Sequence, residues 1–228
     1  MVSVVYNLYF SCNFTVFSID FSVSTFYHMI MVRPAFSEQE NDAIRRTLVD
    51  GALELFRQVE PEELSLRKLA DHLRMSHTKM YRYFDNKNSL LAAVKIRSLE
   101  TLHQFLSEND PVEADPVTRL HAASSALFNF CTEHRKEYLF LFSEANTADE
   151  IAELIQLRHK VFNYIVEIAK IAHTEGYTTL DGRTLAHLSW ATLHGLFLLN
   201  FGGQLMEGRT FEELLESAAE HLFGKIAT

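Results

Sequence analysis

The chain has 228 residues, of which 47% are hydrophobic, and its formal net charge is −9. This length and composition indicate a globular protein that can bury a sizeable core as one large or two small domains. Its two cysteines, Cys12 and Cys131, lie far apart and have no CxxC or Cys/His ligand spacing around them, which excludes a disulfide framework and favours a reducing, cytoplasmic setting.

Residues 1–32 differ in composition from the rest of the chain, because they hold one charged residue, Asp20, and are rich in Phe, Tyr, Val, Ser and Thr. Polar residues interrupt the apolar runs that a signal peptide or a membrane-spanning helix needs. A partial alternation is weakly strand-like, but no second strand is evident to pair with it. We therefore expect residues 1–32 to be an extension outside the fold, with Met29 or Met31 as the working initiator.

From Ser37 onward, apolar residues recur at three- and four-residue spacing, which predicts an all-α protein. The first elements expected are a helix over 38–59, a short helix capped by Ser65, a tight turn at Arg74-Met75, and a third helix capped by Ser76 with Met80 and Phe84 facing inward. Two short helices joined by a tight turn and braced by a longer one describe a helix-turn-helix.

A long helix from Lys87 to about Leu106 is expected to link this head to a second domain. Asn109-Asp110-Pro111 and Asp115-Pro116 mark the boundary that follows it. The helices expected beyond the boundary lie near 116–134, 136–144, 148–174, 182–206 and 211–225.

Three helix starts carry basic residues, although the helix macrodipole favours Asp or Glu there. Arg67 and Lys68 follow Ser65, His77 and Lys79 follow Ser76, and Lys87 follows Asn86. The other predicted starts obey the rule: Ser37 with Glu40, Asp115 with Pro116, Thr147 with Glu150, and Thr210 with Glu213. An external polyanion would explain all three exceptions, and a solvated basic face is the alternative.

The positive charge is concentrated in one segment. Residues 64–97 carry eight Lys and Arg side chains against two acids, whereas residues 98–228 carry nine against nineteen. A basic reading head on an acidic body therefore describes the chain better than its net charge does.

The outer surface of the third helix suits a DNA major groove. With Met80 and Phe84 inside, the residues left outside are His77, Thr78, Lys79, Tyr81, Arg82 and Tyr83. Lys79 and Arg82 can donate to guanine, Thr78 can contact a thymine methyl, and His77 can donate or accept. The two tyrosines suit phosphates, with local packing as the alternative, and a phosphate would also favour Lys87.

The chain here resembles the tetracycline-repressor-like (TetR) transcriptional regulators over about residues 40–95. The resemblance rests on Ala52–Phe56, Ser65–Ala70, Ser76, Met80–Phe84, Asp85-Asn86-Lys87 and Leu90-Leu91. It implies that Arg67, His77, Thr78, Lys79, Tyr81, Tyr83 and Lys87 contact DNA, and Ser76 and Arg82 complete the predicted site. The family usually has Gly at the positions of Glu60 and Arg74, so we expect the turn at Arg74 to be either slightly strained or differently shaped.

In the second domain, Trp190, His194 and Gly195 resemble the Trp/His-Gly (WHG) signature of one C-terminal subgroup of the family. Trp190 and His194 share a helix face and either line a ligand cavity or belong to core or dimer packing. Other candidate lining residues are Phe105, Phe128, Phe130, Tyr138, Phe142 and Phe162, which would favour an apolar or aromatic ligand. For any single one of these six residues, core packing is the favoured alternative. His187 and His194 have no carboxylate ligand nearby, so no metal site is expected, and no cofactor either.

The resemblance implies residues 33–85 as a helix-turn-helix DNA-binding domain and 86–228 as a ligand-binding and dimerisation domain. The last two helices are widely apolar, as the family's dimer interface would require. The leading hypothesis is a homodimeric repressor that a small, largely apolar ligand releases from operator DNA. The alternatives are a helical protein-interaction module and an all-α enzyme using His121, His134 and His194, for which no nucleophile, metal or cofactor spacing is present.

Overall fold

The computed structural model describes residues 37–143, 152–206 and 208–223. The chain divides into two compact units, Met1–Ile44 and Arg45–Thr228. Of the first unit, the structure describes only residues 37–44. The predicted extension over 1–32, Cys12 and the predicted cap Thr147 lie outside the described residues.

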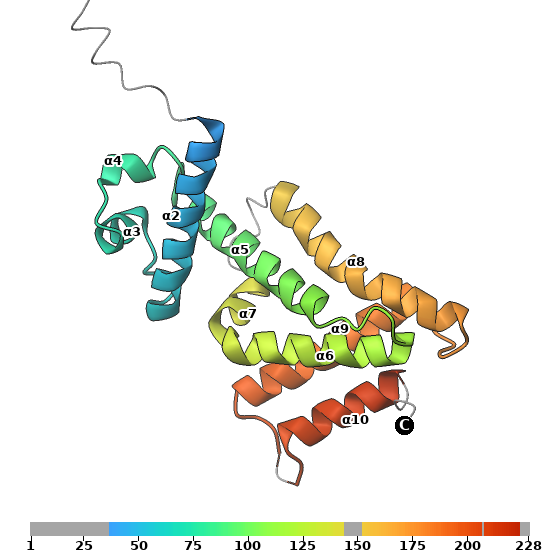
Figure 1. The fold of residues 1–228 in the computed structure, drawn as a ribbon. Coiled ribbons are helices and arrows are strands. Elements are labelled where there is room, and N and C mark those ends of the chain that lie inside the picture. The colour runs from blue at the N-terminus through green and yellow to red at the C-terminus, as the bar shows by residue number, and fades with distance from the viewer. Residues whose placement is uncertain (1–36, 144–151, 207, 224–228) are drawn as a thin grey trace, which may run out of the picture. The chain divides into compact units, whose positions relative to one another are not determined.

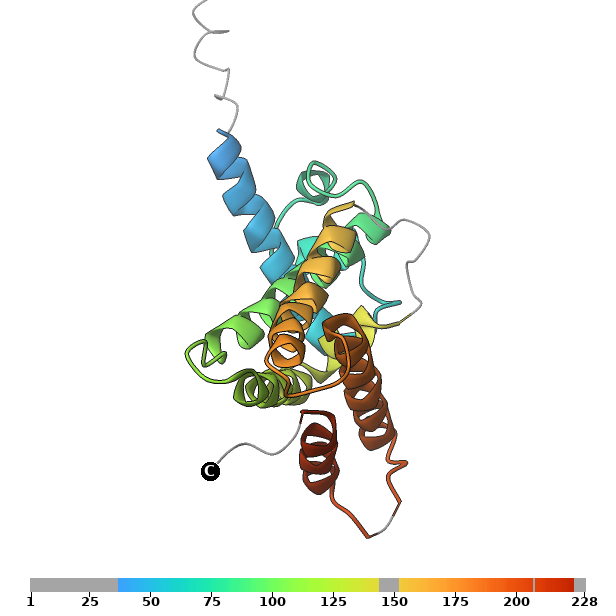
Figure 2. The same cartoon turned by 90° about the vertical axis from the view of Figure 1, so that its right-hand side faces the viewer.

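The described residues form nine helices and no strand, which confirms the predicted all-α class. In order these are α2 (Glu38–Gln58), α3 (Leu66–His72), α4 (His77–Met80), α5 (Lys87–Glu108), α6 (Pro116–Glu133), α7 (Arg135–Leu141), α8 (Ala152–Thr174), α9 (Gly182–Phe201) and α10 (Phe211–Phe223). Helix α5 packs on α6, α7 and α8, and α9 packs on α8 and α10 (Figures 1 and 2). The larger part of the core lies between these helices.

The turn between α3 and α4 has the strain expected at Arg74. Arg74 has a φ of 52°, the only positive φ of a non-glycine residue among those the structure describes. Its N–H donates to Asp71 O at 3.2 Å, and the N–H of Met75 donates to Ala70 O at 2.9 Å. These two bonds form a Schellman motif, which closes a helix through a left-handed residue and usually takes glycine there.

The third helix is shorter than predicted. Met80 and Phe84 are buried as expected, but α4 itself ends at Met80. Beyond it, Arg82 N–H donates to Lys79 O and Tyr83 N–H donates to Met80 O, so the chain continues in the tighter three-residue turns of a 3₁₀ helix. Met80 and Phe84 nevertheless both face inward, because Phe84 N–H donates to Met80 O, one full α turn back.

The prediction of a helix over 182–206 was wrong at its end, because α9 stops at Phe201. Gly203 has a φ of 63°, its N–H donates to Asn200 O, and Gln204 N–H donates to Leu199 O at 2.8 Å. This is a second Schellman motif, here with the glycine that it favours. The Gly202-Gly203 pair indicates the end of this helix, but the apolar residues that continue beyond it led to a longer prediction.

Most of the predicted helix starts carry the predicted caps. Ser65 accepts from Lys68 N–H, and Asn86 forms a capping box with Ser89. The remaining caps are Ser37 with Glu40, Asp115 with Val117 and Thr118, and Thr210 with Glu213. Ser76 is the exception: its hydroxyl makes no capping bond, since Lys79 N–H donates to the Ser76 backbone carbonyl instead.

A polar cluster fixes the connection between α5 and α6. Arg119 donates two hydrogen bonds to Asp110, at 2.9 and 2.7 Å, and the Tyr164 hydroxyl donates a third from α8. The Arg119 guanidinium, together with the hydrogen bond from the Tyr164 hydroxyl, holds the pKa of Asp110 below its usual value. Burial and the Asp110 carboxylate raise the pKa of Tyr164 to about 12, so its proton stays in place to donate.

We expect Arg74→Gly to raise the free energy of unfolding by about 0.5–1 kcal/mol, because a left-handed non-glycine residue costs about 1–2 kcal/mol and the added freedom of glycine in the unfolded chain offsets part of that. Urea denaturation measures the change. Arg74→Ala is the matched control, since it removes the same side chain but keeps the strained φ. An equal gain in both variants would attribute the effect to the lost charge rather than to the backbone.

Candidate DNA-binding surface and ligand cavity

The predicted DNA-contacting residues lie on one helix-turn-helix and most of them are exposed. His77, Thr78 and Arg82 are exposed on and after α4, Tyr81 has 63% of its surface exposed, and Arg67 is exposed on α3. The remaining members are Ser76, which is exposed, and Lys79, Tyr83 and Lys87, which are partly buried. The buried Met80 and Phe84 occupy the inner side of this segment. The predicted DNA-contacting side chains are therefore left on its outer side.

Three of the basic side chains at helix starts have partners within the chain. Lys68 Nζ lies 3.0 Å from a Glu63 carboxylate oxygen, His77 Nε2 lies 3.1 Å from Asp71 Oδ1, and Lys87 Nζ donates to the Glu62 carbonyl at 2.6 Å. The first two pairs are exposed, and exposed ion pairs contribute little, with a typical value of about 0–1 kcal/mol. A phosphate can therefore replace the carboxylate at little cost.

The structure corrects the account of the basic segment over 64–97. Lys95 retains only 4% of its surface exposed, and its ammonium lies over the Phe140 ring, 4.8 Å from the centroid. Arg97 lies 3.0 Å from Asp50 Oδ1 and 3.2 Å from Glu100 Oε2. Both were counted as part of the basic head, but the first lies inside the helical body and the second is neutralised by two acids.

Helix α7 connects α2 to the helical body through a buried carboxylate. Glu137 is 3% exposed, and its Oε1 accepts from Arg57 Nε at 2.7 Å. Lys136 Nζ donates to the Val59 carbonyl at 2.5 Å, and the Phe56 and Phe140 rings lie 4.8 Å apart. Charge, hydrogen bonding and ring packing thus tie the end of α2 to the same seven-residue helix.

The same helix is tied to α9 by Tyr138. Its hydroxyl lies 2.7 Å from His194 Nδ1, and its ring is fully buried. Burial lowers the pKa of His194, which favours the neutral ring whose Nδ1 can accept a hydrogen bond from the Tyr138 hydroxyl. Burial, and after it the Cys131 thiol, raises the pKa of Tyr138, so the hydroxyl remains the donor.

Five of the eight predicted pocket residues pack against other rings and are not among the residues that line the two cavities of the helical body. Phe130 and Tyr138 are fully buried core residues, and the Phe105 ring packs against Phe130. Phe128 packs against Phe211, and His194 lies between Tyr138 and Phe142. For these five residues the packing agrees with the alternative that the sequence left open, which is core packing. Phe142, Phe162 and Trp190 do line a cavity.

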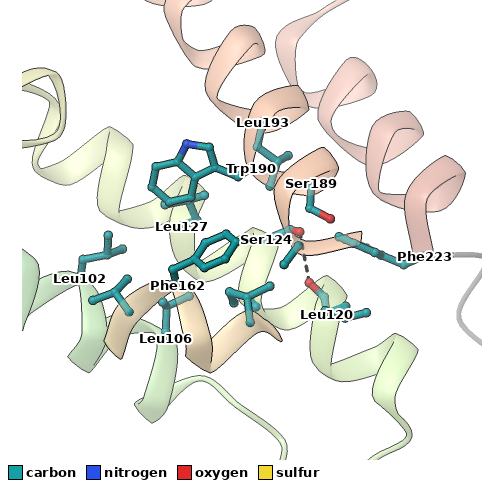
Figure 3. Close-up of a pocket in the computed structure, with 14 residues that line it drawn as sticks. Leu102, Leu106, Leu120, Ser124, Leu127, Phe162, Ser189, Trp190, Leu193 and Phe223 are labelled. Atoms are coloured by element: carbon teal, nitrogen blue, oxygen red, sulfur yellow. Dashed lines mark hydrogen bonds between the residues drawn. The ribbon is translucent and has the colours of Figure 1, made fainter. Parts of the chain in front are cut away.

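The helical body holds two adjacent cavities. The inner one, of about 40 Å³, lies among leucines of α5, α6 and α9, with Phe162 and Trp190 also in its wall (Figure 3). The outer one has about 480 Å³, within the roughly 300–1,000 Å³ of ligand sites. Val161, Phe162 and Trp190 line both, so these three side chains form the wall between them.

The two cavities differ in chemistry. The inner wall is apolar apart from Ser124, whose hydroxyl donates to Leu120 O (Figure 3), and Ser189, whose hydroxyl donates to Leu185 O. The outer cavity has apolar side chains in its lining, such as Leu99, Leu141 and Val161. Its lining also includes four basic side chains that the sequence reasoning missed: Lys95, Arg158, His159 and His187. Lys95 could have been found, because it interrupts the apolar stripe of Leu91, Leu99 and Leu102 along α5.

Over the described ranges, no group of three or more His, Cys, Asp and Glu side chains is arranged to hold a metal ion. In those same ranges no helix combines the length and apolar character that a bilayer crossing requires.

Residues 48–94 match the model of bacterial regulatory proteins of the tetR family, and residues 120–222 match the model of the tetracyclin repressor-like C-terminal domain. Together the two matches span more than half of the chain. The chain belongs to the tetR family of bacterial regulatory proteins. The C-terminal model has a general description, so the WHG subgroup stays a prediction. Among curated proteins, none gives a significant match.

Solved structures share the fold of this family member. A protein of unknown function from Rhodococcus sp. RHA1 has a TM-score of 0.68 at 22% identity, covering 85% of this chain and 97% of its own. The fatty acid degradation regulator FadR from Bacillus halodurans has a TM-score of 0.63 at 14% identity, covering 78% and 94%. AibR, in complex with isovaleryl coenzyme A and operator DNA, has a TM-score of 0.55 at 18% identity, covering 80% and 99%.

We expect Arg57→Met to lower the free energy of unfolding by about 1–3 kcal/mol, because it leaves the buried Glu137 carboxylate without its strongest partner. In the double variant Arg57→Met, Glu137→Met most of that stability should return, since both partners are then apolar. Chemical denaturation of the four proteins in this cycle measures the coupling. If the two single changes simply add in the double variant, the ion pair does not hold α7 to α2.

Proposed function

We propose that this tetR-family protein is a homodimeric repressor in the cytoplasm, which a small, largely apolar ligand releases from its operator. The observation that carries this proposal is the exposed basic face of the helix-turn-helix, whose outward orientation is fixed by the buried Met80 and Phe84. Family and fold point to a transcription regulator. We therefore assign the chain a regulatory and not an enzymatic role, with residues 33–85 as the DNA-binding domain and 86–228 as the domain for ligand and partner copy.

In this proposal the predicted DNA-contacting residues have two kinds of target. His77, Thr78, Lys79 and Arg82 reach base edges in the major groove, since they lie on or just after α4. Arg67, Ser76, Tyr81, Tyr83 and Lys87 hold phosphates and set the register of the head on DNA. Lys87 would exchange its hydrogen bond to the Glu62 carbonyl for a phosphate oxygen, which is a stronger acceptor for a cation.

The outer cavity is the proposed ligand site, and α7 is the proposed link from it to the head. Leu141, Phe142 and Ser143, at and just beyond the end of α7, line the outer cavity, while Glu137 holds Arg57 of α2. A ligand that displaces the cavity end of α7 would thus change the position of α2 and the helices packed with it. Release from DNA then follows from different ligand affinities of the two arrangements.

Two structural neighbours support an acyl ligand. AibR is described in complex with isovaleryl coenzyme A and operator DNA, and FadR is described as a fatty acid degradation regulator. For this chain, the support is a shared fold together with a cavity of about 480 Å³ whose lining includes apolar side chains.

The proposed dimer surface is a face of α9. Leu188 and Leu198 are each 45% exposed there, and Gly195 lies between them at helical spacing. A Cβ built on Gly195 would meet nothing within 4 Å, so no other part of the described chain covers this position. An apolar face with a small residue at its centre lets a second copy of the helix approach closely.

We expect Arg67→Ala to weaken binding to bulk double-stranded DNA and to reduce the slope of log K against log[salt] by about 1.8, because each lost phosphate contact removes about 0.9 and a dimer loses two. Filter binding over a salt series measures the slope. The control is Lys170→Ala, which removes an exposed lysine paired with Glu167 in the helical body. An unchanged slope in the Arg67 variant, or no inverse salt dependence in the wild type, contradicts the proposal.

We expect Gly195→Glu to produce a folded monomer, because the side chain has free space within the protomer but places a charge in the proposed interface. Sedimentation equilibrium gives the mass, and circular dichroism checks the helical fold. Gly195→Ala is the control, since a methyl group adds helix propensity of about 1 kcal/mol without a charge. A Gly195→Glu protein that still dimerises would place the interface elsewhere.

A further inference from the structure

We infer that the ligand carries an uncharged hydroxyl group on an otherwise apolar framework, and that this hydroxyl binds in the outer cavity between His187 and Trp190. It donates to His187 Nε2 and accepts from the indole N–H of Trp190. This inference rests on the proposed function, because it names the polar group of the ligand at the same regulatory site.

The lysine and the arginine in the lining of the outer cavity already have partners. Lys95 lies over the Phe140 ring, and Lys95 and Arg158 each have a further interaction within the chain. The Ser143 hydroxyl donates to Phe140 O at 2.9 Å. A carboxylate bound here would therefore lose its hydration without gaining an unpaired lysine or arginine. The hydrogen-bonding capacity that selects a ligand lies on other side chains of the lining.

His187 offers a hydrogen-bond acceptor to the outer cavity. Its Nδ1 lies 2.8 Å from the Arg183 carbonyl oxygen, one turn back on α9. A carbonyl oxygen can only accept, so Nδ1 carries the hydrogen, and in the neutral ring Nε2 is left as an acceptor. No described residue donates to Nε2. His187 therefore favours a ligand group that can donate a hydrogen bond.

Trp190 offers a hydrogen-bond donor beside this acceptor. Within the described part of the chain its indole makes ring contacts, with Phe142 at 4.8 Å and His194 at 6.2 Å between centroids, but its N–H makes no hydrogen bond. Figure 3 shows the indole nitrogen on the edge of the ring turned away from Phe162 and Leu106. An indole N–H can only donate, and in a partly enclosed ring it usually finds a partner. A ligand oxygen supplies that partner.

One hydroxyl group serves both side chains. His187 and Trp190 lie three positions apart on α9, and both line the outer cavity. Residues at this spacing are neighbours on one helix face, with about 5–6 Å between their Cβ atoms. A hydroxyl oxygen can donate and accept at the same time, whereas an ether, a ketone or a carboxylate can only accept. Each of these three groups would leave His187 Nε2 without a donor.

The inner cavity favours the apolar end of the same ligand. The two hydroxyls in its wall, on Ser124 and Ser189, already donate to backbone carbonyls. The other side chains that line it are apolar, so a polar group would lose its hydration there. Phe162 and Trp190 line both cavities, so apolar atoms of the ligand contact these rings while the hydroxyl stays in the outer cavity.

Matched pairs of probes test the hydroxyl group, each pair being a hydroxyl compound and its methyl ether. The hydroxyl compounds are para-butylphenol, nonanol and a terminally hydroxylated methyl decanoate, and butylbenzene and nonanoate complete the set. Calorimetric titration into the full-length protein measures each affinity. We expect the hydroxyl compound of the best pair to bind about fivefold more tightly than its ether, the effect of one hydrogen bond. The tightest pair identifies a phenol, an alkanol or a hydroxylated acyl chain as the source.

Two variants separate the acceptor from the donor. His187→Phe keeps a ring beside Phe162 and should abolish the advantage of the hydroxyl compound while leaving the affinity for its ether unchanged. Trp190→Phe should weaken the hydroxyl compound and the ether equally, by about fivefold relative to butylbenzene, because both accept from the indole N–H. The control His173→Phe, an exposed position of α8 outside the lining, should change none of them. Thermal melting checks that each variant is folded, and His187→Phe decides the matter if Trp190→Phe is not.

Equal affinity for the hydroxyl compound and its ether in every pair, tighter binding of nonanoate than of nonanol, or a full hydroxyl advantage in His187→Phe overturns the inference. A parallel DNA-binding titration separates this result from the proposed function. Binding of a hydroxyl probe without release of DNA keeps the ligand class and refutes release. DNA binding without binding of any probe keeps the DNA-binding function and refutes the ligand class.

Discussion

The structure depends on how the Glu137 carboxylate is kept buried. A charge with 3% of its surface exposed is stable only when it is paired, and here Arg57 provides the pair from α2 at 2.7 Å. Because Glu137 and Tyr138 are consecutive on a short helix, the carboxylate faces α2 while the tyrosine reaches His194 of α9. A helix of seven residues has little freedom to keep one of these contacts without the other. The position of α7 is therefore set jointly by its contacts with α2 and α9.

The sequence was informative about structure that is encoded locally. A helix start is decided by the capping residue and its neighbour three positions on, and the caps at Ser65, Asn86 and Asp115 were confirmed. The strained turn at Arg74 was also predicted, since only the left-handed region closes the Schellman motif there. The end of α9 was missed because apolar residues continue past Phe201, and periodicity alone does not show where the backbone reverses.

The cavity could not be predicted in the same way. It forms where α5, α7, α8 and α9 meet, and the residues that line it come from segments up to about a hundred positions apart. Aromatic type alone did not separate Phe142, which lines the cavity, from Phe130, which is closed in by its neighbours. The exposed residues of the helix-turn-helix were easier to predict, because two inward side chains, Met80 and Phe84, fix the orientation of one short segment.

The basic residues of this acidic chain fall into two groups, which carry the same sign of charge but differ in their exposure to solvent. Arg67 and Arg82 are exposed, where binding to a polyanion would release the counterions of the polyanion and where salt weakens the contact. Lys95 is buried beside the Phe140 ring, where salt screens its charge much less. One net charge of −9 therefore conceals two kinds of basic residue, and they respond differently to ionic strength. For that reason raised salt should weaken the proposed contact with DNA well before it disturbs the packing around Lys95, so the two effects can be separated by salt alone.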